Sequence, residues 1–172
     1  MKKIAILGST GSIGRSTLSI ISAYPERFSV VSLAAGNDAD ALFRQALRYK
    51  PRLISIANEE DARSIREGLE MSGLEDIQVV HGPAGNVAVS THAEAEFVVS
   101  AIVGVAGLEA TYEAVRAGKT LGLANKEALV VAGELITAEA RRQGKPLLPH
   151  RSDGFGKEVR SHQVHPREKF VG

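Results

Sequence analysis

Residues 8–14 read GSTGSIG and directly follow the apolar run IAIL at residues 4–7. The apolar, partly β-branched run predicts a buried strand, and the following pattern predicts a helix over residues 12–23. The three glycines therefore lie in a turn between a strand and a helix. A backbone in such a turn can approach a pyrophosphate, which binds the free N–H groups at the helix N-terminus. The stretch predicts a phosphate-binding loop.

Each glycine of this loop has an expected role. Gly8 makes the turn, Gly11 leaves room for phosphates, and Gly14 allows close contact between helix and strand. The spacing G-x-x-G-x-x-G differs from the G-x-G-x-x-G usual for NAD enzymes, so the pattern depends on its strand–helix context. The alternative is a tight turn that binds no ligand. Three glycines argue against this alternative, because each loses conformational entropy on folding and the turn would gain no binding function in return.

Strands and helices alternate along the rest of the chain up to Pro149. Further strands are predicted at residues 28–35, 53–57, 77–81, 97–103 and 119–124. Further helices are predicted after the second and third strands, at residues 107–117 and at residues 126–143. This alternation predicts right-handed βαβ units. We expect a Rossmann-like, doubly wound α/β fold with a mostly parallel sheet and helices on both faces.

Composition excludes several classes of protein. Lys and Arg total 21 against 20 Asp and Glu among 172 residues, which indicates neither a nucleic-acid partner nor an anionic membrane. The absence of Cys excludes disulfides and thiolate metal sites. The sequence shows no signal peptide and no apolar stretch long enough to span a membrane. We expect a cytoplasmic protein.

Two charged residues near the loop have two interpretations each. Asp38 follows the second strand, where an acid can bind the ribose 2′-OH of NAD, but a helix cap is the favoured interpretation. Arg15 lies in the first helical turn, where a cation opposes the helix dipole, so it either contacts an anion or is solvated. These residues leave the choice between NAD and NADP open.

A second informative stretch is KTLGLANKEALV at residues 119–130. Asn125, Lys126 and Glu127 follow a predicted strand, at the edge where open α/β sheets bind ligands. Asn125 and Glu127 suit a ribose or an amide, and Lys126 suits an anionic substrate. The alternative is an ordinary helix start, with Asn as cap and Glu in the first turn.

The segment SAIVGVAGL at residues 100–108 also ends a predicted strand. Ala101, Ile102 and Gly104 could line one face of a nicotinamide ring, because small residues leave room for a flat ring. They are equally suited to the strand core and the turn after it, which is the slightly favoured interpretation.

The periodic pattern ends at Pro149. Residues 150–172 are charged, contain three of the five histidines and show neither strand nor helix periodicity. We expect a domain over residues 1–149 followed by a disordered tail. His162 and His165 are spaced to hold a transition metal, but solvated side chains on that tail are the favoured interpretation.

The motifs GSTGSIG, AAGN, AIVGVAGL and AGKTLGLANKEALVVAG together resemble the 1-deoxy-D-xylulose 5-phosphate reductoisomerase family, from Met1 to Pro149. The resemblance implies an NADPH-binding domain. It also implies an enzyme family that rearranges and reduces 1-deoxy-D-xylulose 5-phosphate to 2-C-methyl-D-erythritol 4-phosphate in isoprenoid precursor synthesis. The family is homodimeric and uses Mg²⁺ or Mn²⁺.

The resemblance also implies individual site residues. Lys126 would contact the substrate. The cofactor contacts would be Thr10, Gly11, Ser12, Ile13, Gly36, Asn37, Asn125 and Glu127. Family members often carry a cation after the glycine of the AG motif, whereas this chain has Asn37 and Asp38. Preference for NADPH over NADH is therefore less secure than in the family.

The chain departs from the family's V-D-S-E-H metal motif. Arg151 falls at the Asp position, Ser152 matches, and Asp153 falls at the Glu position. A cation at the first ligand position repels Mg²⁺, so we predict no metal site and no complete catalytic set. The chain is then interpreted as a truncated cofactor domain that is inactive alone. A shifted reading frame near codon 150 would explain why the resemblance stops there.

Two other functions compete with this interpretation. One is a non-catalytic nucleotide-sensing or scaffolding domain that uses the tail as an interaction arm. The other is an unrelated small NAD(P) oxidoreductase that uses Lys126 and Glu127.

Overall fold

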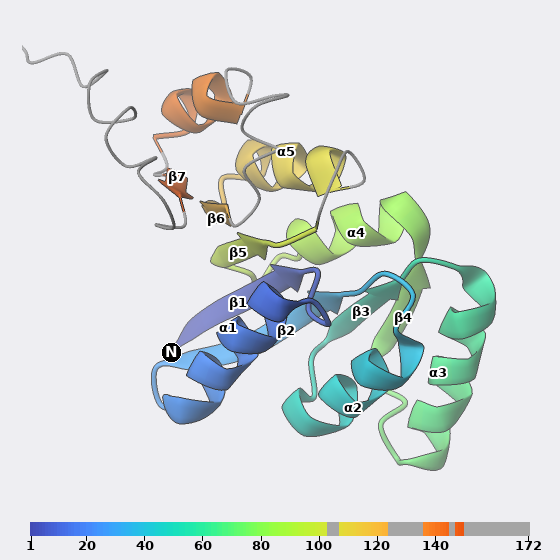
Figure 1. The fold of residues 1–172 in the computed structure, drawn as a ribbon. Coiled ribbons are helices and arrows are strands. Elements are labelled where there is room, and N and C mark those ends of the chain that lie inside the picture. Colours follow the sequence, from blue (N-terminus) through green and yellow to red (C-terminus); the bar gives the residue numbers. More distant parts are fainter. Residues whose placement is uncertain (103–106, 124–135, 145–146, 150–172) are drawn as a thin grey trace, which may run out of the picture.

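A single parallel sheet organises the protein (Figure 1). The computed structural model describes residues 1–102, 107–123, 136–144 and 147–149. The described strands are β1 (Lys2–Leu7), β2 (Phe28–Ala34), β3 (Leu53–Ile56), β4 (Gln78–His81), β5 (Phe97–Ser100), β6 (Thr120–Leu123) and β7 (Leu147–Pro149). Their order is β4-β3-β2-β1-β5-β6-β7, and every described neighbouring pair is parallel. The predicted parallel sheet is confirmed.

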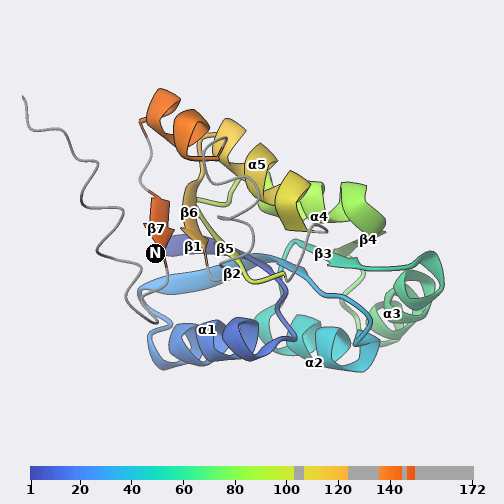
Figure 2. The same cartoon turned by 45° about the horizontal axis from the view of Figure 1, so that its top comes forward.

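Helices cover both faces of the sheet, as predicted for a doubly wound fold. They are α1 (Ser12–Ala23), α2 (Ala39–Tyr49), α3 (Glu59–Met71), α4 (Gly82–Ser90) and α5 (Leu108–Arg116), and residues 136–142 are also helical. Figure 2 shows α1, α2 and α3 below the sheet, with α4 and α5 above it.

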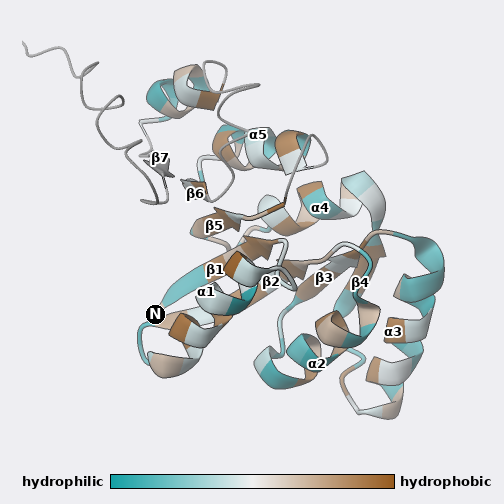
Figure 3. Ribbon diagram, viewed as in Figure 1, coloured by the Kyte–Doolittle hydropathy of each residue, from teal (hydrophilic) through white to brown (hydrophobic). Residues whose placement is uncertain are grey.

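The core forms two apolar layers, one on each side of the sheet. Alternate residues of β1 face opposite layers: Ile4 and Ile6 pack with α1, α2 and α3, whereas Ala5 and Leu7 pack with α4 and α5. Burial on both faces explains why the strands read as continuous apolar runs rather than alternating ones. The strands accordingly appear hydrophobic between helices that are polar on their outer sides (Figure 3).

Helix α1 has the bounds that the sequence predicts. Its apolar pattern also predicts that Leu18, Ile20 and Ile21 are all buried, which is wrong for Ile20. Leu18 and Ile21 are buried, whereas Ile20 is 56% exposed. A helix turns about 100° per residue, so Ile20 lies roughly 200° around the axis from Leu18. One side of the helix contacts the sheet, and Ile20 faces solvent.

Helix α4 has no counterpart in the sequence prediction. Its sequence GPAGNVAVS contains two glycines and a proline, which lower intrinsic helix propensity. Pro83 lies in the first turn, where its missing N–H costs no helical hydrogen bond. Gly85 packs so closely that an added Cβ would lie 2.4 Å from Ser55 Oγ. Tertiary contact with β3 therefore favours this helix where local propensity does not.

Strand β5 is shorter than predicted. Its last paired residue is Ser100, which lies opposite Leu7 of β1. Beyond Leu7 the chain of β1 turns away, so β5 loses its neighbour on that side. The predicted end at residue 103 lies outside the described residues.

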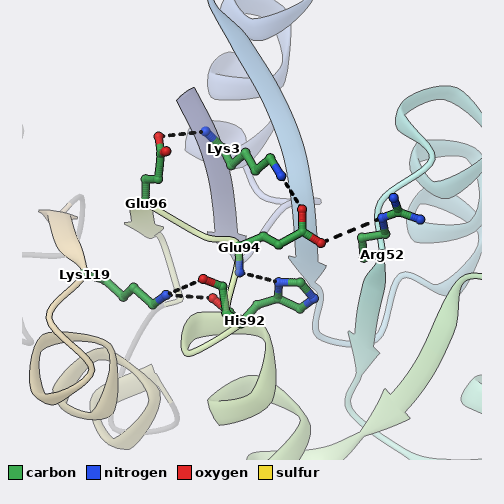
Figure 4. Close-up of polar contacts among 7 residues, drawn as sticks. Lys3, Arg52, His92, Glu94, Glu96 and Lys119 are labelled. Carbon is green, nitrogen blue, oxygen red and sulfur yellow. Dashed lines mark hydrogen bonds and ion pairs between the residues drawn. The ribbon is translucent and has the colours of Figure 1, made fainter. Parts of the chain in front are cut away.

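Polar side chains hold the segment that leads into β5 at the amino edge of the sheet (Figure 4). Lys3 forms an ion pair with Glu94, and Arg52 lies 4.0 Å from the same carboxylate. Lys119 Nζ donates a hydrogen bond to the His92 carbonyl at 2.8 Å. Burial lowers the pKa of Lys119. These contacts join β1, β3 and the start of β6 to one segment.

We expect Glu94→Gln to remove a pH-dependent stabilisation. The hydrogen bond from Lys3, and then its charge, lower the pKa of Glu94 below its ordinary value. A depressed carboxyl pKa stabilises the fold above the unfolded pKa and loses that effect as pH falls through the folded pKa. The stability difference between wild type and variant should therefore be largest near neutral pH and vanish in acid.

Urea unfolding at a series of pH values measures this difference. Glu67→Gln is the matched control, because Glu67 has no ion-pair partner among the described residues. A Glu94→Gln effect that does not change with pH would contradict the assigned role.

Candidate functional site

The glycine loop lies where the strand order reverses. β1 is flanked by β2 on one side and β5 on the other, and the loop leaves β1 at its carboxyl end. In open α/β sheets, ligands bind in the crevice outside the carboxyl ends at this reversal point. The loop that the sequence singles out therefore occupies the expected ligand-binding position of the fold.

A tight turn forms the loop. Gly8 has a φ of +82°, a left-handed conformation that favours glycine. The Gly11 N–H donates to the Gly8 carbonyl at 3.2 Å and closes a four-residue turn. The N–H groups of Gly8 and Ser9 both donate to the Ala34 carbonyl of β2 at 2.8 Å. The predicted role of Gly8 is confirmed, and the neighbouring strand anchors the turn.

Gly14 brings α1 against this turn. A Cβ added at Gly14 would lie 2.3 Å from the Gly8 carbonyl oxygen and 2.6 Å from Ser9 Cα. The predicted close approach is confirmed, although the partner is the turn after the strand rather than the strand itself. At Gly11 the nearest such contact is 3.4 Å and the residue is exposed, so the space predicted there is present.

Four backbone N–H groups around this turn are free. Helix α1 begins at Ser12 with Gly11 as N-cap and has no acidic residue in its first turn. The N–H groups of Thr10, Ser12, Ile13 and Gly14 find no acceptor among the described residues. Free N–H groups at the positive end of a helix dipole attract an anion. The arrangement can hold a phosphate group.

The two ambiguous charged residues have local partners. Asp38 Oδ1 accepts a hydrogen bond from the Ala41 N–H at 3.0 Å, which confirms the favoured interpretation as a cap of α2. Arg15 is exposed, and its Nη1 donates to the Thr10 carbonyl at 2.9 Å. Arg15 therefore stabilises the loop through this hydrogen bond, a role that neither sequence interpretation included.

Gly36 and Asn37 follow β2 and are exposed at the same edge of the sheet. A Cβ at Gly36 would meet nothing within 4 Å. Because β1 and β2 are parallel neighbours, this segment and Thr10–Ile13 follow adjacent strand ends. The structure thus brings six of the predicted cofactor residues to one edge.

Other predicted residues lie outside the described part of the chain: Gly104, Asn125, Lys126, Glu127, Arg151, Ser152, Asp153, His162 and His165. Strand β6, which precedes the LANKE segment, ends at Leu123 beside β5. Within the described ranges, no group of three or more His, Cys, Asp or Glu side chains is placed to hold a metal ion. The helices searched in those ranges include none that is both long and apolar enough to cross a membrane.

Two features near the loop have no sequence signal. Gln45 of α2 donates through Nε2 to the Ser9 carbonyl at 3.0 Å, a contact 36 positions apart in the chain. A groove of about 420 Å³ also runs between α1 and α2. Its lining includes three arginines and one acid: Arg15, Arg44, Arg48 and Asp38. Each arginine looks like an ordinary surface residue until the two helices are placed together.

The fold and the loop define the class of protein: a Rossmann-like domain of the NAD(P)-binding type. Residues 4–133 match the 1-deoxy-D-xylulose 5-phosphate reductoisomerase family. This chain belongs to that family.

Individual relatives agree with this assignment. The 1-deoxy-D-xylulose 5-phosphate reductoisomerase of Anaeromyxobacter sp. (strain K) is 48% identical over 149 residues, which are 87% of this chain and 37% of the relative. A crystal structure of DOX-P reductoisomerase in complex with NADPH, fosmidomycin and magnesium has a TM-score of 0.82 at 36% identity and covers 87% of this chain and 36% of its own.

The reductoisomerase from Zymomonas mobilis in complex with NADPH has a TM-score of 0.80 at 36% identity. That match covers 86% of this chain and 38% of the Zymomonas chain. The present chain therefore spans little more than a third of the length of the relatives that it matches.

We expect Gly14→Ala to destabilise the protein by about 1–3 kcal/mol, the usual cost of overpacking a closely packed site. The added Cβ would overlap the backbone of the turn, which cannot move without losing its bonds to Ala34. Gly36→Ala is the matched control, because its Cβ enters open space, and we expect a change within about 1 kcal/mol. Urea unfolding compares the two variants, and equal losses would contradict the close packing at Gly14.

Proposed function

We propose that residues 1–149 form the NADPH-binding domain of a reductoisomerase and that the glycine loop holds the cofactor diphosphate. One observation carries the proposal: the four free N–H groups of the loop surround an exposed glycine at the reversal point of the sheet. The reductoisomerases crystallised with NADPH match this chain over the same fold, which supports NADPH as the ligand.

Different residues of the chain bind different parts of the cofactor and the substrate. The amides of Thr10, Ser12 and Ile13 hold the diphosphate, and Gly36 and Asn37 lie on the adenosine side, after β2. By resemblance to the family, Asn125 and Glu127 complete the cofactor site, and Lys126 contacts the substrate. When bound, the nicotinamide supplies a hydride. These residues orient it.

The groove between α1 and α2 favours NADPH over NADH. Its lining contains three arginines, Arg15, Arg44 and Arg48, and a single carboxylate, that of Asp38. Asp38 lies two residues after Gly36. One Asp38 oxygen is already engaged by the Ala41 N–H. The net positive charge of this lining suits the 2′-phosphate that distinguishes NADPH.

We propose further that the 172-residue chain does not convert 1-deoxy-D-xylulose 5-phosphate by itself. The reaction of the family uses a divalent cation held by carboxylates. Arg151 stands where the resemblance places the first of these carboxylates, and a guanidinium repels such a cation.

We expect saturable NADPH binding that is tighter than NADH binding at low ionic strength. Cofactor fluorescence reports the titration, and the chain contains no Trp to interfere. Equal affinities would show that the 2′-phosphate is not recognised. Binding of neither cofactor would contradict the proposed function.

Ser12→Pro tests the loop directly within this titration. Ser12 is the first residue of α1, where proline fits the helix, and the preceding Gly11 has extended dihedral angles compatible with it. The substitution deletes one free N–H, so NADPH affinity should fall roughly tenfold or more, as expected for a charge-assisted hydrogen bond. Glu59→Pro, at the first residue of α3, is the matched control and should leave affinity unchanged.

An assay with 1-deoxy-D-xylulose 5-phosphate, NADPH and Mn²⁺ should show no cofactor oxidation above the background without protein. A full-length reductoisomerase in the same buffer is the positive control. Product formation by the chain would refute the proposed inactivity while leaving NADPH binding in place.

A further inference from the structure

Gln45 ties α2 to the glycine loop. Its Nε2 donates to the carbonyl of Ser9, a residue with no exposed surface. Ser9 and Thr10 are the two central residues of the turn that the Gly11 N–H closes on the Gly8 carbonyl. The Ser9–Thr10 peptide is therefore the central peptide of a β-turn, the unit whose orientation distinguishes one turn type from another.

The orientation of this peptide decides what the loop presents to a ligand. None of the described peptide bonds is cis, so the Ser9 carbonyl and the Thr10 N–H point in opposite directions. With the carbonyl held by Gln45, the Thr10 N–H points away from α2 and has no acceptor among the described residues. In the reversed orientation, the carbonyl oxygen would replace that donor and repel a phosphate.

We propose that Gln45 is a positioning residue that holds the Ser9–Thr10 peptide with its N–H available to the cofactor diphosphate. The inference rests on the proposed NADPH-binding function and adds a residue that does not itself touch the cofactor.

The unpaired oxygen of the half-buried Gln45 side chain indicates that its amide serves the loop rather than the stability of the fold. Gln45 Oε1 is buried without a hydrogen-bond partner, and so is the Ser9 hydroxyl. A buried polar atom without a partner costs free energy that an apolar side chain of similar size avoids. Met at position 45 would remove the unpaired oxygen, which stabilises the fold, but would leave the buried Ser9 carbonyl without its donor, which destabilises it by a similar amount. Its net effect on the free energy of unfolding should be small.

The turn also has a restraint of its own. Reversing the central peptide of a type I turn gives a type II turn, which needs a positive φ at its third residue. That residue is Thr10, which is β-branched, and among the described non-glycine residues only Lys50 has a positive φ. Gln45 therefore acts with Thr10, and removing it should weaken dinucleotide binding by roughly three- to tenfold, the usual range for one neutral hydrogen bond.

The test compares Gln45→Met with Gln78→Met in the full 172-residue chain. Gln78 is exposed on β4 at the far edge of the sheet, so the control makes the same chemical change away from the loop. We measure NADP⁺ affinity, urea unfolding and, without ligand, the amide NMR signals of Thr10 and Gly11. Gln45→Met should lower affinity three- to tenfold, change stability little, and broaden or shift these amide signals. Gln78→Met should leave the affinity, the stability and these amide signals unchanged.

Gln45→Glu adds a readout that a merely structural role would not produce. The ionised carboxylate cannot donate to the Ser9 carbonyl, so affinity relative to wild type should be low at pH 8. The protonated acid can donate, so this ratio should recover toward one as pH falls below the carboxyl pKa, about 4.3 in an unperturbed Glu. NADP⁺ is used because it withstands acid better than NADPH.

Separate results would overturn the inference and the proposed function. Unchanged Thr10 and Gly11 signals in Gln45→Met, or an affinity loss that only parallels a loss of stability, would overturn the positioning role. A pH-independent ratio for Gln45→Glu would overturn it too. If wild type binds no NADP⁺ or NADPH, the proposed function fails, and the ligand-free NMR comparison still decides whether Gln45 orients the turn.

Discussion

The contact of Gly14 with the Gly8–Ser9 backbone is the constraint on which the rest of the site depends. It places the N-terminus of α1 directly on the turn that ends β1, with no room for a Cβ between them. This approach allows the free N–H groups of the helix and the turn to face a single anion. A side chain at Gly14 would separate those donors and would push α1 away from the sheet that it covers.

Two further elements hold the turn from outside. β2 contributes the Ala34 carbonyl, which accepts two hydrogen bonds, and α2 contributes Gln45. The Gly8 and Ser9 N–H groups and the Ser9 carbonyl thus have partners inside the protein, while the Thr10, Ser12, Ile13 and Gly14 N–H groups have none among the described residues. The amino edge of the sheet is different, because there Lys3, Glu94 and Lys119 pair with groups of the protein itself. Among the described residues, the carboxyl edge therefore has unpaired donors, whereas these charged groups at the amino edge are paired.

The sequence predicted most elements because their signals are local. Apolar runs indicated the strands, and Asp38 is a helix cap that the sequence already indicated. It failed where long-range contact outweighs local preference. Helix α4 is rich in helix-breaking residues but packs on β3, and Ile20 is apolar but lies on the outer side of α1.

The sequence by itself determined the family and the position of the glycine loop, because glycine spacing and strand–helix alternation can be recognised in consecutive residues. Only the tertiary structure decided that Gln45 reaches Ser9 and that arginines of two helices share one groove. Those pairings join residues far apart in the chain. Their physical cause is the packing of α1 and α2 side by side on one face of the sheet, which no local pattern specifies.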